Sequence, residues 1–240
     1  WSGRRWWPGG EGSSDDDNRS HSLPLARGDA VRVAGWVAEY ASAKRPSDLT
    51  VTQLQDVTYE VLTSGNALPA VTVVGRDGRL PPKDIVDNDG FGIFDPKEDG
   101  IDFYESLEGM LVRINEPRVV GCTDRYGQMY VLGDDADEVT LSERGVLLLE
   151  PNNLHPQCIQ LNRFNVDLPI ANVGDKLSDA VGVYSYSFGE YEVLLTEELS
   201  LIQGGLEPDI SELKGGPGYL TIGSYNVCIN SGGMRICIHW

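Results

Sequence analysis

The chain has 240 residues, 40% hydrophobic and 23% charged, with a formal net charge of −18 and a pI of about 4.4. This is the composition of a folded globular protein rather than a disordered one, and no apolar run approaches the roughly 18 residues that span a bilayer. The acidity argues against a general nucleic-acid coat, because phosphate binding requires concentrated Lys and Arg, and it suits a secreted protein kept soluble by charge repulsion.

Residues 1–22 are rich in Gly, Ser and Asp and show no apolar periodicity, so we expect a disordered leader. Order begins near Gly28. The alternation over 31–37 predicts a half-buried strand, and the same pattern predicts strands over 49–61 and 71–74. The first third of the chain is therefore expected to be β-rich.

A single short helix is predicted over residues 102–109. It follows a long acidic loop, residues 76–100. Asp102 is expected to cap the helix, with Glu105 reaching back in a capping box, and Gly109 to end it.

Three more strands are predicted at 111–114, 118–122 and 128–132, with a hairpin turn at 124–127. Strands, one short helix and strands again are the order of an OB-fold, a partly open five-stranded barrel. We therefore expect an OB-like barrel over residues 23–140. A β-sandwich carrying a stray helix is the alternative that the pattern leaves open.

The second half repeats the opening pattern. Gly174-Asp175 followed by Gly182 echoes Gly28-Asp29 followed by Gly35, each glycine permitting a bend or bulge in a strand. This echo predicts a second, smaller OB-like domain over residues 141–203. The Gly- and Pro-rich residues 204–218 then read as a linker, and the apolar residues 219–227 as the first strand of a further domain.

Three stretches, in their order along the chain, resemble the bacterial extracellular endonucleases of the endonuclease/exonuclease/phosphatase superfamily. The first joins Leu49-Thr50-Val51-Thr52-Gln53-Leu54 with Phe103-Tyr104-Glu105-Ser106-Leu107-Glu108-Gly109-Met110. The second joins Val173-Gly174-Asp175 with Tyr186-Ser187-Phe188-Gly189-Glu190-Tyr191, and the third is the strand from Ile222 to Val227. The resemblance covers roughly residues 23–227.

This resemblance implies a mainly β, two-barrel accessory region that precedes a missing α/β nuclease domain in a secreted protein. Asn226 matches the family's Asn at the end of the first nuclease strand, so residues 219–240 are expected to be the truncated start of that domain. A full-length nuclease of this kind would use Mg²⁺ and/or Ca²⁺. No cofactor is expected for this chain, and by itself we expect it to be inactive.

Partner binding is predicted at cationic loops of the first barrel. OB barrels bind single-stranded nucleic acid across one sheet face and its flanking loops. The candidate residues for DNA or RNA are Lys44, Arg45, Arg118, Arg125 and Tyr126. Ordinary surface charge explains them about as well.

The acidic loop offers a second candidate site. Hard oxygen ligands suit Ca²⁺, and the candidate ligands are Asp87, Asp89, Asp95 and Asp99. The spacing does not match an EF-hand, so a solvated acidic loop is the favoured interpretation. An alternative function follows from this site, namely a structural or calcium-binding β module that anchors or spaces a secreted protein.

The aromatic side chains of the predicted strands are expected to pack in the core or close the barrels. These are Trp36, Tyr184, Tyr186, Phe188 and Tyr191.

Overall fold

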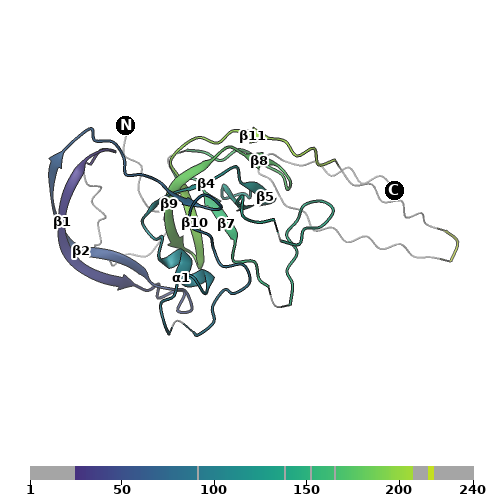
Figure 1. Ribbon diagram of the computed structural model, residues 1–240, viewed down its shortest axis with the longest axis horizontal. Coiled ribbons are helices and arrows are strands. Elements are labelled where there is room, and N and C mark those ends of the chain that lie inside the picture. The colour runs from purple at the N-terminus through teal and green to yellow at the C-terminus, as the bar shows by residue number, and fades with distance from the viewer. Residues whose placement is uncertain are drawn as a thin grey trace. The chain divides into compact units, whose positions relative to one another are not determined.

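The computed structural model describes residues 25–207 except 91, 138, 152 and 165, together with residues 216–218 (Figure 1). The predicted leader, the predicted strand at 219–227 and Asn226 lie outside the described residues. The described chain forms two compact units. One contains residues 25–46 and 50–69, and the other contains residues 47–49 and 70–207.

The first unit is a long antiparallel hairpin of β1 (Ala30–Tyr40) and β2 (Val51–Thr63). The predicted strands are therefore confirmed here. The pairing register shifts between Ala34 and Trp36, which confirms the expected bulge at Gly35. A Cβ on Gly35 would lie 2.7 Å from the carbonyl oxygen of Gln55, so the glycine lets the two strands approach at the bulge.

The aromatic prediction is wrong for this hairpin. Trp36 is 74% exposed rather than packed in a core. It pairs with Gln55 across the ladder, and a two-stranded sheet has no second layer of its own to bury such a side chain.

The second unit is built on one nine-stranded sheet that curls into a half-barrel (Figure 1). Its strands, in spatial order, are β11 (Leu201–Ile202), β8 (Lys176–Leu177), β5 (Arg118–Gly121), β6 (Gln128–Leu132), β7 (Cys158–Asn162), β10 (Glu190–Leu195), β9 (Ala180–Ser187), β4 (Leu111–Ile114) and β3 (Thr72–Val74).

A mainly β architecture is thus confirmed, but the predicted boundary at residue 140 does not separate two barrels. β6 pairs with β7 over five residues, and β4 pairs with β9, so strands from both sides of the boundary share one sheet. The repeated Gly-Asp motif is a repeated turn instead. Asp29 accepts the amide of Ala26, and Asp175 accepts the amide of Asn172, each three residues earlier.

The helix α1 (Gly100–Glu105) starts earlier than expected and is capped by a different residue. The carboxylate of Asp99 accepts the amide of Asp102 at 2.9 Å, so Asp99 rather than Asp102 is the N-cap. Glu105 does not reach back to the cap, because it accepts a hydrogen bond from the Tyr191 hydroxyl at 2.6 Å. In the described part of the chain, no helix is long and apolar enough to cross a membrane.

The core lies between α1 and the inner face of the half-barrel. Leu107, Leu161 and Val193 are fully buried there. The rings of Tyr104 and Tyr184 stack at 5.4 Å, which joins the helix to β9. The packing prediction is therefore confirmed for Tyr184 and Tyr186, whereas Phe188 is 62% exposed because it occupies the β9–β10 turn at a positive φ.

Candidate functional site

The five predicted nucleic-acid contacts are divided between the two units. Lys44 and Arg45 belong to the first unit. Arg118 begins β5, while Arg125 and Tyr126 occupy the turn at the far end of that strand. Within the second unit, the side chains of Arg125 and Tyr126 contact each other. The Arg125 guanidinium lies 4.6 Å from the Tyr126 ring centroid, a cation–π contact that uses the aromatic face expected to stack on a base.

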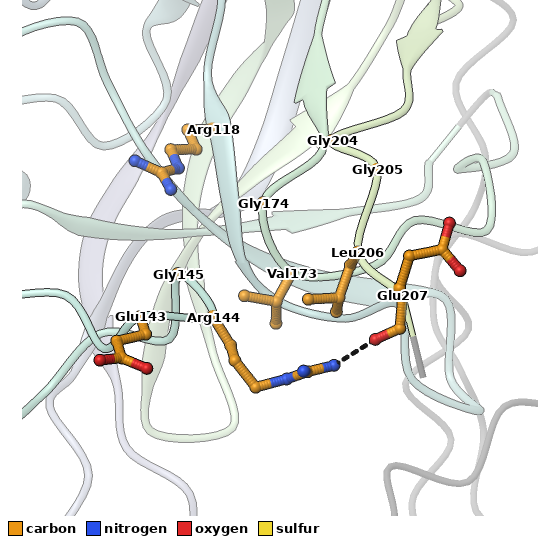
Figure 2. Close-up of a pocket in the computed structure, with 10 residues that line it drawn as sticks. All are labelled: Arg118, Glu143, Arg144, Gly145, Val173, Gly174, Gly204, Gly205, Leu206 and Glu207. Atoms are coloured by element: carbon orange, nitrogen blue, oxygen red, sulfur yellow. Dashed lines mark hydrogen bonds between the residues drawn. The ribbon is translucent and has the colours of Figure 1, made fainter. Parts of the chain in front are cut away.

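Arg118 lines a cavity of about 280 Å³ whose lining also includes a second arginine, which was not predicted from the sequence (Figure 2). This residue, Arg144, extends beneath Val173 and Leu206 and donates a hydrogen bond to the Glu207 carbonyl at 2.6 Å. The remaining lining residues are Glu143 and four glycines. The lining therefore combines two arginines, two glutamates, the apolar side chains of Val173 and Leu206, and glycine backbone.

A tight turn presents Arg144. The amide of Gly145 donates to the carbonyl of Ser142, and the Ser142 hydroxyl accepts the amide of Val146. Gly145 has a φ of +85°, where a glycine is favoured, and an added Cβ would lie 3.1 Å from Nη2 of Arg118. The adjacent residues Arg144 and Gly145 are the feature of the sequence from which an exposed arginine in a turn could have been predicted.

A buried carboxylate holds the opposite wall of the cavity together. Asp175 accepts the amides of Asn172 and Gly204, at 2.7 Å each. The backbones at Gly204 and Gly174 approach so closely that a Cβ on Gly204 would lie 2.5 Å from the carbonyl carbon of Gly174. Residues 204–207, the first part of the linker predicted over 204–218, line this side of the cavity.

Arg118 is the cation best placed to receive a ligand. Its guanidinium forms no hydrogen bond or ion pair with any residue that the structure describes. A guanidinium presents five donors in a planar fork that matches phosphate and carboxylate oxygens. The cavity can therefore bind an anionic group at Arg118, although Glu143 and Glu207 limit how much negative charge it accepts.

The four predicted calcium ligands accept hydrogen bonds from nearby backbone amides. Asp87 accepts from Asp89 and Gly90, and Asp89 in turn accepts from Gly92 and Ile93. Asp95 accepts the amide of Lys97, and Asp99 caps α1. Burial and the neighbouring carboxylates, Asp102 foremost, raise the pKa of Asp99. Among the described residues, no three His, Cys, Asp or Glu side chains are arranged to hold a metal.

A second polar cluster lies on the outer face of the sheet, where Glu192 is only 4% exposed. Its carboxylate accepts the Asn162 amide at 2.6 Å. Burial raises the pKa of Glu192, opposed by the Asn162 hydrogen bond and assisted by the charge of Glu190. A buried carboxylate with a raised pKa costs stability when ionised, and such groups are concentrated at functional sites.

Replacing Glu192 with Gln should therefore stabilise the protein at neutral pH. A raised folded-state pKa means that the stability contribution is full below the ordinary value of 4.5 and is lost as the pH rises through the folded-state value. The advantage of Glu192→Gln should accordingly vanish below pH 4.5. Urea unfolding across this range measures it, with the exposed Glu198→Gln as the control. An equal advantage at every pH would contradict the assignment.

Comparison with known families places this fold in a family. Residues 73–204 match DUF8508, a domain of unknown function, and the chain belongs to that family. The match runs from β3 to the Gly204 wall of the cavity and crosses residue 140 without a break, as the single sheet does. No curated protein and no solved structure matches the chain.

Proposed function

We propose that this chain is the accessory region of a secreted, metal-dependent endonuclease, and that Arg118 binds a phosphate of the DNA or RNA substrate. The observation that carries the proposal is the Arg118 guanidinium, which lines the cavity with glycine backbone and has no hydrogen bond or ion pair among the described residues. Arginine pairs with phosphate through two parallel hydrogen bonds, so one free guanidinium provides both position and charge.

The net negative charge of the chain limits phosphate binding to a local site and keeps it weak. A net charge of −18 repels a polyanion at long range, but charges more than about 8 Å apart are largely screened in physiological salt. Arg118 can therefore hold a phosphate locally while the rest of the acidic surface does not. Binding is weak in this arrangement, and it serves to deliver substrate to a catalytic domain that supplies the metal and the reaction.

We expect Arg118→Ala to weaken binding of labelled single-stranded oligothymidine about tenfold. A charge-assisted hydrogen bond contributes about 1.5–3 kcal/mol, and about 1.4 kcal/mol corresponds to one factor of ten. The slope of log affinity against log salt should also fall by about 0.7, the value for one phosphate contact on a single strand. Fluorescence anisotropy at low and moderate salt measures both quantities.

Arg32→Ala is the matched control, since it removes the same charge from an exposed ion pair with Glu60 in the first unit. Its affinity should equal that of the unmodified chain. No binding at low salt, together with a melting temperature that rises with Ca²⁺, would reject the proposal in favour of a structural, calcium-binding module.

A further inference from the structure

A row of four polar residues and one glycine crosses the outer face of the half-barrel, one residue from each of five adjacent strands. Tyr130 on β6 pairs with Gly121 on β5 and with Gln160 on β7. Glu192 on β10 pairs with Gln160 and with Ser185 on β9. Cross-strand partners share a face of the sheet, so these five residues, which we call the polar row, point the same way.

The polar row points away from the core. The neighbours of its members along the strands point inward, and Met129, Val131 and Leu161 are among the most deeply buried residues. Polar residues are ordinary on the outside of a sheet, but two of these are not exposed. Gln160 is 5% exposed and Glu192 is 4% exposed, so both lie recessed between their neighbours.

Gln160 has an unused hydrogen-bonding side chain. Its amide makes no side-chain hydrogen bond with any residue in the described part of the chain, and the carboxylate of Glu192 accepts only from Asn162. The Gln160 amide is not among the buried side-chain groups that lack a partner in the described residues, so its polar atoms reach solvent. An amide and a carboxylate side by side offer two donors and several acceptors to a ligand placed above them.

Tyr130 supplies a flat wall next to this recess. A Cβ on Gly121 would lie 3.1 Å from Cβ, 3.2 Å from Cδ2 and 3.6 Å from Cγ of Tyr130, so the side chain lies down over the bare backbone of β5. Tyr130 is nevertheless 37% exposed. One side of its ring is thus covered by Gly121, which leaves the other side available for stacking.

From this row we infer a binding site for an uncharged, extended oligosaccharide, which would stack a sugar ring on Tyr130 and direct its hydroxyls to Gln160 and Glu192. Sugar hydroxyls are both donors and acceptors, so they satisfy an amide and a carboxylate at once. Partly open β-barrels bind oligosaccharides as well as oligonucleotides. The two glutamates on this face, Glu190 and Glu192, repel phosphates and favour the neutral ligand.

Adjacent strands lie about 4.8 Å apart, which is close to the repeat of a β-linked sugar chain, so successive sugar rings can follow the polar row from strand to strand. This geometry favours extended β-1,4-linked chains over helical ones. The site is separate from the Arg118 cavity in its residues and in the charge of its ligand.

Isothermal titration of the full chain with cellohexaose, mannohexaose and chitohexaose tests the inference. At least one of the three should bind, and Tyr130→Ala should weaken that binding by about tenfold or more, as expected when an aromatic stacking contact is removed. Gln160→Leu should weaken it as well, since it keeps the volume and removes the amide. Tyr40→Ala, which removes a 46% exposed tyrosine from the first unit, should leave the affinity unchanged.

Hexagalacturonate, which carries carboxylates, should not bind. Three outcomes would overturn the inference. They are no binding of any of the three neutral hexasaccharides, the same affinity with Tyr130→Ala as with Tyr40→Ala, or oligothymidine binding that depends on Tyr130 while saccharide binding does not. Circular dichroism of each variant confirms that a lost affinity is not a lost fold.

Discussion

Leu161→Ala is expected to reduce the free energy of unfolding of the second unit by about 2–5 kcal/mol, the range for deleting a buried leucine side chain. Leu161 is 0% exposed and belongs to β7, where it pairs with Met129 on one side and Val193 on the other. The cavity left behind would lie at the centre of the sheet, where neighbouring strands restrict its collapse. Domains are stable by only about 5–15 kcal/mol, so the loss is a large fraction of the total.

Urea unfolding followed by far-ultraviolet circular dichroism measures this loss. The midpoint should fall while the slope stays constant, because the surface exposed on unfolding hardly changes. Leu149→Ala is the matched control, the same chemical change at a residue that is 71% exposed. Its effect should stay within about 0.5 kcal/mol. Equal midpoints for the two variants would show that β7 is not at the centre of the core.

Local features of this fold could be predicted from the sequence because they depend on a few adjacent residues. The Asp124–Gly127 turn is an example, since Gly127 donates to the Asp124 carbonyl and the Asp124 carboxylate accepts two further amides. The β9–β10 turn is another, with Phe188 and Gly189 both at positive φ, as a two-residue hairpin loop requires. Four or five adjacent residues are enough to determine the geometry of such a turn.

Strand pairing between distant segments could not be predicted in the same way. β7 pairs in parallel with β10, about thirty residues further along the chain, and no turn or spacing marks that partnership. The repeated Gly-Asp motif suggested a duplicated barrel, but in the structure it forms only the same type of turn at two places. The helix cap was misplaced for a similar reason, because Asp99 and Asp102 both precede apolar residues and only the packing of α1 selects between them.

The candidate sites also combine features that can be predicted from local sequence with features that depend on contacts between distant segments. Arg118 was identified from its residue type, whereas Arg144 and the Gly204 wall belong to the cavity through contacts over distances that the sequence does not reveal. The polar row is a more extreme case. Its members come from five strands, and their adjacency depends entirely on the register of the sheet.

Gly182→Ala is expected to destabilise the protein by about 1–3 kcal/mol or more, the range for overpacking a core. Gly182 lies inside β9 without a positive φ, so its backbone suits any residue, and an alanine within a strand would ordinarily be the better choice. Here the added Cβ would lie 2.7 Å from Cγ1 of Val193 and 2.8 Å from the carbonyl carbon of Leu194. The predicted bulge at Gly182 is absent, because its pairing to β4 and β10 is regular.

The sign of the change makes this prediction specific. If Gly182 were needed only for backbone flexibility, the alanine variant would be as stable as the unmodified chain or more stable. If β10 packs closely against Gly182, the alanine variant must be less stable. Gly92→Ala is the control, in an exposed loop where the nearest atoms lie 3.3 Å from the added Cβ.

Val193→Ala in the Gly182→Ala background then separates the two contacts. If the Val193 methyl group causes most of the strain, the double variant should be more stable than the sum of the single losses implies. If the two losses add, the Leu194 backbone is the obstacle, and β10 must shift relative to β9 to admit any side chain at position 182. Urea unfolding measures these stabilities. A urea midpoint for Gly182→Ala at or above that of the unmodified chain would contradict the close approach of β9 and β10.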